Sequence, residues 1–536
     1  MTAIDTNSFK NMAITVPPMD TVPMEHTKVA RTSGQPAEVA GQSAVTKDSV
    51  TFSKNATAIV GENSATVQDD DSIQVGGAGV VTDGDMTVTE MKTALAEARG
   101  IDQSDVIVLN GTKKGDNINV TARKNGGITV TVNGKSHNYT AEQASRLIIN
   151  GGAGNDKITV DKAVKNDLVI MGGAGNDTIQ GGAGNDTIVG GKGNDTLKGG
   201  AGNDRITDDS GVNKIYGQAG DDTLIAHSKS TNSSSKYSNQ IYGGSGNDYL
   251  EGGNGKDYLS GGDGYDVLYG LGGNDYLTGG KGNDYLDGGE GNDSLHGGSG
   301  RDNLIGGKGN DKLYGDSGKD LLIGCSGKDT VDGGDGKDSV ITDGKDKITK
   351  DSADAKAKTI KPIDIPENFS IEGNTYETAR IASDLEFLAN TKQGQMMFNS
   401  IAATGHDVTI DVTAQGSSCG SYVGWNSDPN RGSDSFVHYN VSKIALNGGY
   451  NYSNRAPVVS MYHELCHSYN AATGTMNTNY YDQTTGKKVA DGAIGSAKGV
   501  EWQAVGIAND RVAANHKYLT ENGLRDLLGY ETRTRY

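Results

Sequence analysis

Two histidines and a glutamate near the end of the sequence have a spacing suited to metal-dependent hydrolysis. His463, Glu464 and His467 lie in VVSMYHELCHSYN, residues 458–470. On a helix, positions four apart leave the same face, so both imidazoles can bind one zinc ion. Glu464 is displaced around the helix and can serve as a general base beside that ion. On the motif alone, two histidines that only pack in a core or lie on the surface remain the alternative.

A catalytic zinc ion takes three protein ligands and keeps one position open. Glu501, in GVEWQAVGIAND, is the first choice for the third ligand, ahead of Asp510 and then His516. The residues after His467 are Ser-Tyr-Asn-Ala-Ala-Thr, so the extended third-histidine spacing of metzincins is absent. The sequence therefore predicts a site of two histidines and a carboxylate.

Three further residues near this motif could contribute to it. Tyr480 and Tyr481 are candidates to donate a hydrogen bond to the oxyanion that forms when water attacks a carbonyl, and plain packing is the alternative. Cys466 lies between the histidines but off their face. We expect Cys466 to be an ordinary buried cysteine rather than a ligand.

The elements that must position these residues form a small α+β unit. Pro457 and the apolar residues after it predict a largely buried helix. Upstream, ETARIASDLEFLANT has helical periodicity, HDVTIDVT alternates as a strand, and SFVHYNVS (residues 435–442) is a second strand candidate. We also expect SFVHYNVS to be able to pair with an extended substrate backbone.

The same region resembles the NleD-like family of type III effector zinc metalloproteases over roughly residues 376–525. The resemblance rests on GQMMFNSIAATGHDVTIDVT, GWNSDPN, VVSMYHELCHSYNAATG and VEWQAVGI. It implies a zincin-like metallopeptidase with His463, His467 and Glu501 as zinc ligands and Glu464 as catalytic base. Members of the family are bacterial effectors that enter host cells, and some cut host signalling kinases. The short effectors have no repeat array in front of the peptidase, so the delivery route and substrate stay open.

The middle of the chain repeats a nine-residue motif. GGAGNDKIT begins at residue 151, four further copies run from 172 to 207, and a second array has aspartates at every ninth position from 248 to 338. Glycines permit the turn, the aspartate supplies a carboxylate, and the single Leu or Ile of the following x-Leu/Ile-x points inward. Two such motifs form one turn of a parallel β-roll. A flexible glycine linker would need neither the aspartate nor the Leu/Ile.

Oxygen ligands and stacked carboxylates favour Ca²⁺, because the carboxylates would repel one another without a cation. This array resembles the RTX family of calcium-binding repeats, GGxGxDxUx. The predicted calcium ligands are Asp177, Asp186, Asp195, Asp204, Asp248, Asp257, Asp266, Asp275, Asp284, Asp293, Asp302, Asp311, Asp320 and Asp329. HSKSTNSSSKYSNQ, residues 227–240, interrupts the array and is expected to be a surface loop.

The chain is therefore predicted to be multidomain. We expect a largely disordered leader region at 1–100 with one helix, DMTVTEMKTALAEARG, that a Thr87–Glu90 capping box opens and Gly100 ends. The other predicted segments are a β region before the repeats at 101–170, the RTX β-roll at 171–345, a linker at 346–375, and the peptidase domain at 376–536.

Composition and net charge limit the classes of binding partner and the cellular location that we expect for this protein. A net charge of -19 disfavours nucleic acid as a partner and favours bound cations. No segment reaches the ~20 apolar residues of a membrane span, and MTAIDTNSFKNMAITVPPMD lacks the features of a cleavable secretory signal. Three cysteines are too few for a disulfide framework. We expect a protein secreted without a cleaved signal, with delivery into host cells as an extension of that expectation.

The leading hypothesis is a secreted bacterial zinc endopeptidase that acts on host proteins, with one catalytic Zn²⁺ and several structural Ca²⁺ ions. The calcium-binding array would fold outside the producing cell, where calcium is abundant. The alternative is a calcium-binding extracellular structural or adhesion protein whose C-terminal domain cuts nothing, or only its own chain.

Overall fold

The computed structural model describes residues 74–75, 87–208, 210–226, 237–349, 356–361, 363–372 and 375–411. It also describes short pieces farther on, namely 420–423, 435–438, 458, 462, 465–466, 480–482, 488–489, 496–498 and 527–528. All of these residues belong to one unit, Asn63–Tyr536. Most of the predicted leader region lies outside the described residues.

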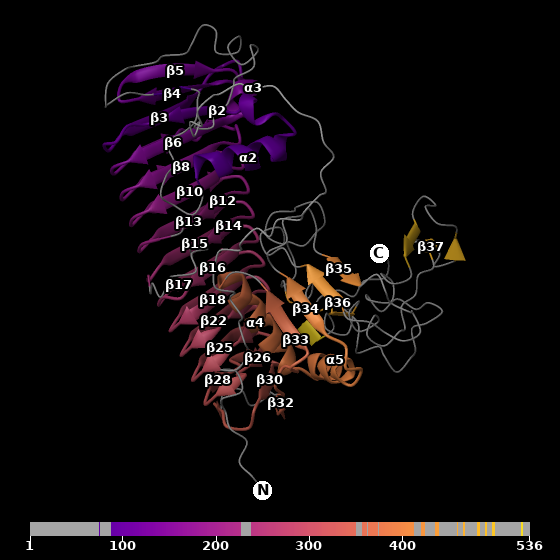
Figure 1. Ribbon diagram of the computed structural model, residues 1–536. Coiled ribbons are helices and arrows are strands. Elements are labelled where there is room, and N and C mark those ends of the chain that lie inside the picture. The colour runs from indigo at the N-terminus through magenta and orange to yellow at the C-terminus, as the bar shows by residue number, and fades with distance from the viewer. Residues whose placement is uncertain are drawn as a thin grey trace, which may run out of the picture. The chain divides into compact units, whose positions relative to one another are not determined.

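A parallel β-solenoid occupies the repeat region, as the nonads predicted (Figure 1). Ile188 pairs with Ile206, and Leu197 pairs with Ile215, so successive turns are 18 residues apart. Each nonad contributes one strand, and successive nonads alternate between two sheets. The first sheet contains β2 (Ile107–Asn110), β6 (Leu147–Ala153), β8 (Val169–Ala174), β10 (Thr187–Lys192), β12 (Arg205–Thr207), β14 (Thr223–Ile225), β16 (Tyr249–Gly253), β18 (Val267–Gly273), β20 (Tyr285–Asp287), β23 (Asn303–Ile305), β26 (Leu321–Ile323), β30 (Ser339–Thr342) and β32 (Lys356–Thr359).

The second sheet runs alongside the first. It contains β3 (Asn117–Ala122), β7 (Lys157–Val160), β9 (Thr178–Gln180), β11 (Thr196–Ala201), β13 (Lys214–Ala219), β15 (Gln240–Ser245), β17 (Tyr258–Asp263), β19 (Tyr276–Lys281), β22 (Ser294–Gly300), β25 (Lys312–Gly318), β28 (Thr330–Asp332) and β31 (Lys347–Ile348). Short strands β21 (Glu290–Gly291), β24 (Lys308–Gly309), β27 (Ser326–Gly327) and β29 (Asp335–Gly336) lie in the turns.

The single Leu or Ile of each repeat fills the space between the two sheets. Ile179, Leu197, Leu277, Leu286 and Leu313 are all 0 % exposed and belong to one continuous core. Each turn contributes only two such side chains, so the core is long and thin. Its stability depends on neighbouring turns because a single turn cannot bury its own apolar residues.

The first turns of the solenoid have antiparallel additions. β4 (Ile128–Val132) and β5 (Lys135–Tyr139) extend the second sheet beyond β3, and β1 (Gln74–Val75) pairs with β2. Helix α2 (Val88–Arg99) begins with the predicted capping box: the N–H of Glu90 donates to Oγ1 of Thr87, and the N–H of Thr87 donates to Oε2 of Glu90. Gly100 follows at φ +63° and ends the helix. The short elements η2 (Gln103–Asp105) and α3 (Ala141–Ala144) complete this end.

An insertion and an ordered stretch after the repeats modify the regular array. β13 pairs with β15 across a separation of 26 residues instead of 18, so the predicted insertion is accommodated without loss of alignment. Residues 346–375, which we expected to form a linker, contain β31 and β32 of the solenoid and β33 (Phe369–Glu372) of the next sheet. Apolar residues such as Ile360 and Phe369, which pack in a core, explain why this stretch is ordered into strands. The other predicted domain limits stay predictions.

The C-terminal region has a mixed sheet and two long helices. The strand order is β33, β34 (Val408–Asp411), β36 (Ser435–His438) and β35 (Gly420–Val423), with only the β35–β36 pair antiparallel. Helices α4 (Thr375–Ala389) and α5 (Lys392–Ala402) connect β33 to β34, and Thr391 caps α5 through the N–H of Gly394. The predicted helix and both predicted strands are thus confirmed.

The expected pairing of SFVHYNVS with a substrate is not supported by the register. β36, which contains the first half of this stretch, lies between β34 and β35 and pairs with both. Its two hydrogen-bonding edges are therefore already used along Ser435–His438, and an incoming peptide has no edge to join there.

Candidate functional site

The repeat aspartates form two hydrogen-bonded ladders along the solenoid. The backbone N–H of Asp177 donates to Oδ1 of Asp195 at 2.7 Å, and that of Asp284 donates to Oδ1 of Asp302 at 2.8 Å. Each ladder takes every second nonad because one turn contains two of them. The carboxylate therefore ties the backbone of one turn to the side chain of the next.

All fourteen predicted calcium ligands belong to these ladders. The first ladder is Asp116, Asp156, Asp177, Asp195, Asn213, Asn239, Asp257, Asp275, Asp293, Asp311, Asp329 and Asp346. The second ladder is Asp186, Asp204, Asp222, Asp248, Asp266, Asp284, Asp302, Asp320 and Asp338.

Five ladder aspartates were not among the predicted ligands, namely Asp116, Asp156 and Asp346 of the first ladder and Asp222 and Asp338 of the second. Asp222 stands in AGDDTLI and Asp338 in GKDSVI, and both occupy the repeat position directly before an x-apolar-x strand. The nonad of Asp338, GGDGKDSVI, matches the full motif, whereas Asp222 is identified only by its position because Gln218 replaces the second glycine of its nonad. Conversely, Asn213 and Asn239 keep the hydrogen bond of the first ladder but carry no charge.

Each ladder hydrogen bond uses Oδ1 of an aspartate, so the ladder does not use the second carboxylate oxygen, Oδ2. Within the described part of the chain, Oδ2 is buried without a hydrogen-bond partner in Asp177, Asp195, Asp204, Asp222, Asp248, Asp266, Asp275, Asp284, Asp293, Asp302, Asp311, Asp320 and Asp329. Burial raises the pKa of Asp177 to about 7 and the pKa values of Asp248 and Asp275 to about 9. Ionised oxygens in such positions require a nearby cation.

The glycines leave room for that cation. A Cβ atom on Gly172 would lie 2.5 Å from Oδ2 of Asp177 and 2.6 Å from the carbonyl oxygen of Gly190. Carboxylate and carbonyl oxygens from successive turns thus border a space that only glycine keeps open. These are the oxygen ligands that Ca²⁺ prefers, so the ladders fit calcium.

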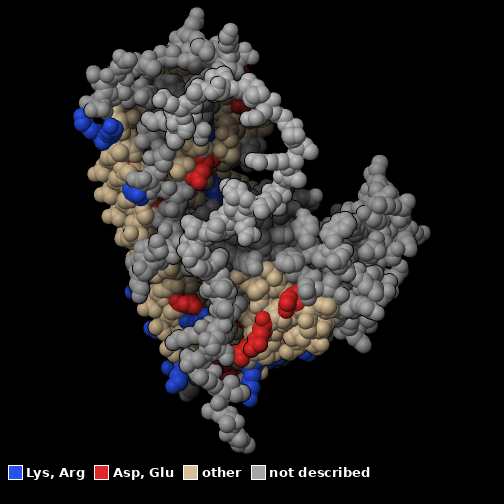
Figure 2. Space-filling model, viewed as in Figure 1, with Lys and Arg blue, Asp and Glu red and all other residues tan. Residues whose placement is uncertain are grey.

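Few carboxylates reach the visible surface of the solenoid. Where grey atoms do not cover it, Figure 2 shows mainly uncharged surface, with carboxylates in small groups and Lys or Arg toward the margins. Ladder members such as Asp284 and Asp302 are 0 % exposed. The ladder carboxylates therefore lie inside the roll, where bound cations would neutralise them.

The segment around the paired histidines is described at four positions. Val458, Tyr462, Leu465 and Cys466 are helical and 0 % exposed, which confirms a buried helical segment and a buried Cys466. The hydroxyl of Tyr462 donates to the carbonyl of Gln393 in α5 at 3.2 Å. This contact joins the segment to α5.

The predicted catalytic and metal-binding residues lie outside the described residues. These are His463, Glu464, His467 and Glu501, together with the lower-ranked ligands Asp510 and His516. Tyr480 and Tyr481 belong to strand β37 (Tyr480–Asp482), which pairs with β38 (Lys488–Val489) and β39 (Ser496–Lys498). The role of these tyrosines as oxyanion donors stays a prediction.

Comparison with protein families assigns two segments of the chain. A family model described as an RTX calcium-binding nonapeptide repeat (4 copies) matches residues 148–161, 169–197, 198–228, 235–268, 260–295, 269–304, 296–324 and 318–344. The model of the Peptidase_M91 family, described as an effector protein, matches residues 366–536. The chain joins an RTX calcium-binding roll to a Peptidase_M91 effector domain. No curated protein matched the chain.

Helix α4 of the effector domain packs on the first sheet of the RTX roll. Tyr249, Tyr269 and Tyr285 of the roll share a core with Ile381 and Leu385 of α4. These outward-facing roll positions are buried because the effector domain covers them. The roll and the effector domain thus share an apolar core.

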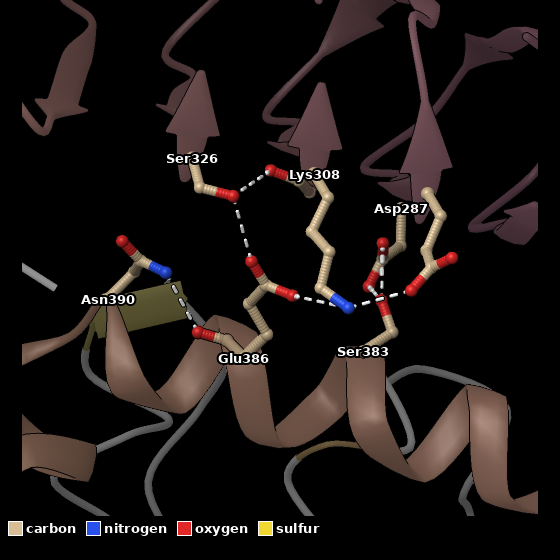
Figure 3. Close-up of polar contacts among 8 residues, drawn as sticks. Asp287, Lys308, Ser326, Ser383, Glu386 and Asn390 are labelled. Atoms are coloured by element: carbon tan, nitrogen blue, oxygen red, sulfur yellow. Dashed lines mark hydrogen bonds and ion pairs between the residues drawn. The ribbon is translucent and has the colours of Figure 1, made fainter. Parts of the chain in front are cut away.

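Polar side chains complete this contact (Figure 3). Oγ of Ser383 lies 2.9 Å from both carboxylate oxygens of Asp287, and Oγ of Ser326 donates to Oε1 of Glu386 at 3.1 Å. Nζ of Lys308 lies 4.0 Å from Oε2 of Glu386. Burial, reinforced by the charge of Asp384, raises the pKa of Asp287 to about 8.

A buried arginine anchors the other end of α4. Arg380 is 2 % exposed, donates to the hydroxyl of Tyr249 at 3.0 Å, and lies 3.9 Å from Glu251. Its guanidinium also lies over the ring of Tyr269, 5.4 Å from the centroid. Nothing in the sequence pattern of the repeats indicated that Tyr249 and Glu251 would contact a second domain.

The described residues contain no cluster of three or more His, Cys, Asp or Glu side chains arranged to hold a metal ion. The histidines and the glutamate of HELCH lie outside the described residues. In the same described part, no helix is long and apolar enough to cross a bilayer.

Proposed function

We propose that this protein is a secreted, zinc-dependent endopeptidase that cleaves host proteins, with a calcium-bound RTX roll as its folding and export module. The observation that carries the proposal is the position of HELCH, residues 463–467, inside the segment that matches the Peptidase_M91 effector family. The effector family and the RTX repeats are both consistent with a secreted protein that acts on a protein substrate.

Helical periodicity supports the proposed site. The buried residues Val458, Tyr462, Leu465 and Cys466 recur at intervals of four, three and one, which defines one stripe of a helix. On a helix in this register, positions 463 and 467 fall on a different stripe, about 100° or more away from the centre of the buried one. We therefore expect the two imidazoles to point away from the α5 contact.

The donor set suits zinc. Two imidazoles and one carboxylate, from His463, His467 and Glu501, are a known ligand combination for catalytic zinc, and bound zinc supplies a Lewis acid for the scissile carbonyl. In the proposed mechanism Glu464 removes a proton from the attacking water and later delivers it to the departing amide nitrogen. Tyr480 or Tyr481 would donate a hydrogen bond to the developing oxyanion.

The test uses the full chain in millimolar calcium and compares the wild type with Glu464→Gln. Zinc content is measured by mass spectrometry, and new protein N-termini are counted after incubation with a host-cell lysate. We expect one zinc per chain in both proteins and new N-termini only with the wild type. Glu367→Gln, which alters an exposed glutamate of the same domain, is the matched control and should cleave normally.

Two outcomes would contradict the proposal. Wild-type protein without zinc would exclude the metal site. Equal cleavage by the wild type and Glu464→Gln would exclude Glu464 as the base. New N-termini within the chain itself, with none in the lysate, would favour self-processing by a calcium-binding extracellular protein.

A further inference from the structure

The face of the RTX roll that contacts α4 differs from the rest of the roll. Tyr285 and Ile305 are 1 % exposed, and Leu321 is 5 % exposed, although all three sit beside the inward-pointing leucine rather than at it. On the second sheet, Tyr276 at a comparable position is 36 % exposed. The outward positions of β16 to β26 are therefore a docking surface for α4.

Each docking strand begins directly after an aspartate of the second ladder. Asp248 precedes Tyr249, Asp284 precedes Tyr285, and Asp320 precedes Leu321. The aspartates of the first ladder precede strands of the second sheet instead, on the side that α4 does not contact. The calcium ladder nearest to α4 is thus the second one.

Residues of the second ladder also accept hydrogen bonds from the backbone N–H groups of the docking residues. The N–H of Tyr285 donates to the carbonyl of Asp266 at 2.8 Å, and the N–H of Leu321 donates to the carbonyl of Asp302 at 2.8 Å. The N–H of Tyr249 donates to the carbonyl of Asp222 at the same distance. Any shift of the ladder between turns therefore moves the aromatic and apolar side chains on which α4 packs.

Ladder alignment depends on neutralising the buried oxygens. Oδ2 of Asp248, Asp266, Asp284, Asp302 and Asp320 is buried without a hydrogen-bond partner among the described residues. Ionised carboxylates stacked at successive turns repel one another when no cation lies between them. The ordered register of β16 to β26 then requires calcium or protonation.

We propose that calcium bound along the second ladder between Asp248 and Asp320 forms the surface on which α4 docks, so that calcium controls the folding of the effector domain. α4 shares its core with the roll, and β33, α5 and the Tyr462 segment pack in that same core. Calcium control of cleavage rests in addition on the proposed peptidase function, whereas calcium control of docking does not.

Hydrogen exchange of the full chain measures docking directly. The amides of residues 375–389 report on α4, and those of 303–305 and 321–323 report on the roll. The chain carries Glu464→Gln throughout, so self-cleavage cannot affect the result, and the outcome is independent of whether the domain is a peptidase. We expect α4 amides to gain protection with the same calcium midpoint as the roll strands.

Variants that remove ladder charges test which carboxylates set the calcium dependence of α4 protection. Asp284→Asn with Asp302→Asn keeps the Oδ1 acceptor, as Asn213 and Asn239 do in the first ladder, but removes two carboxylates. We expect the calcium midpoint for α4 protection to rise at least about tenfold, since calcium affinity follows the charge of its ligands. The control, Asp186→Asn with Asp204→Asn, changes the same ladder at turns that α4 does not contact and should shift this midpoint less than about threefold.

A second variant covers the case in which the ladder variant fails to fold. Tyr285→Ala removes a docking side chain and leaves every ladder carboxylate in place. We expect its roll strands to gain calcium-dependent protection while its α4 amides lose theirs. Calcium-independent protection of α4 in the parent chain, equal shifts in both aspartate pairs, or full α4 protection in Tyr285→Ala would each overturn the proposal.

Discussion

The phenol of Tyr269, in the calcium-binding roll, donates a 3.1 Å hydrogen bond to Oδ1 of Asp384, in helix α4, across 115 residues of sequence. Both side chains are buried, and Arg380 lies 3.5 Å from the other carboxylate oxygen of Asp384. Burial raises the pKa of Asp384 to about 6, against the lowering effect of Arg380. This hydrogen bond links a buried carboxylate of the effector domain to an aromatic residue of the repeat array.

Removing that hydrogen bond should weaken the contact. Tyr269→Phe leaves a buried carboxylate oxygen without its donor, so we expect a loss of about 1–3 kcal/mol in the free energy of unfolding of α4. Urea denaturation followed by hydrogen exchange at residues 375–389 measures it. Tyr276→Phe, at a partly exposed position of the second sheet, is the control and should stay within about 0.5 kcal/mol of the wild type.

The inward leucines should be the main source of stability in the roll. Leu286→Ala leaves a cavity in the thin core between the sheets, and we expect it to cost about 2–5 kcal/mol in calcium-saturated protein. Calorimetry at saturating calcium gives this value. Leu271→Ala truncates a leucine that faces the α4 core instead, so it should affect α4 protection more than the melting of the roll. Equal effects of the two variants on the melting of the roll would contradict this division.

Calcium-free roll should be more stable in acid than at alkaline pH. Burial raises the pKa of Asp195 to about 6, of Asp204 to about 8 and of Asp248 to about 9, all above the ordinary value of 3.8. A carboxyl whose pKa is raised in the folded state contributes stability that is complete below 3.8 and is lost as the pH rises through its folded pKa. Circular dichroism in a chelator should therefore show loss of β structure between about pH 6 and pH 9.

The same pKa values predict that calcium binding releases protons. Protonated aspartates must lose their protons before they can act as ligands, so apparent calcium affinity should rise as the pH increases from 6 to 9. Calorimetric titrations in buffers of different ionisation enthalpy give the number of protons released per calcium. Binding without proton release at pH 7 would show that the calcium-free carboxylates are already ionised.

One strained position offers a stabilising substitution. Gln218 has φ +85° at the second glycine position of its nonad, a conformation that costs a non-glycine residue about 1 kcal/mol. We expect Gln218→Gly to raise the stability of the roll by roughly 0.5–1 kcal/mol, measured by thermal denaturation. Gln180→Gly, in strand β9 at an ordinary φ, should lower it by a similar amount because glycine weakens a strand. The same sign for both substitutions would exclude backbone strain as the cause.

Much of the roll was predictable because the residue patterns that specify it are local and repeated. The aspartate spacing, the inward Leu or Ile and the paired glycines each specify one strand and one turn, and 18 residues per turn follow from two nonads. The capping box of Thr87 and Glu90 was predictable for the same reason. Asp222 was missed as a ligand because its nonad departs from the full motif while keeping the aspartate position.

The candidate zinc site could be predicted only in part from local sequence patterns. HELCH specifies donors and a helical spacing, and the buried helical positions Val458 and Leu465 agree with it. The predicted third ligand, Glu501, lies in a segment 34 or more residues away, and whether it reaches the histidines depends on folding that no local pattern encodes. Strand β37 illustrates the same limit, since Tyr480 and Tyr481 had no strand signal strong enough to predict their pairing.

The sequence by itself determined the roll and the regular spacing of its aspartates, and it predicted candidate peptidase residues, because each of these depends on residue types at short, regular spacings. Only the tertiary structure showed that side chains of the roll also form part of the effector-domain core. Tyr249 and Tyr269 resemble the other tyrosines of the array in sequence, and Tyr276 is exposed while they are buried. The difference is the presence of α4, which packs on one sheet and not the other through contacts more than 100 residues apart in the chain.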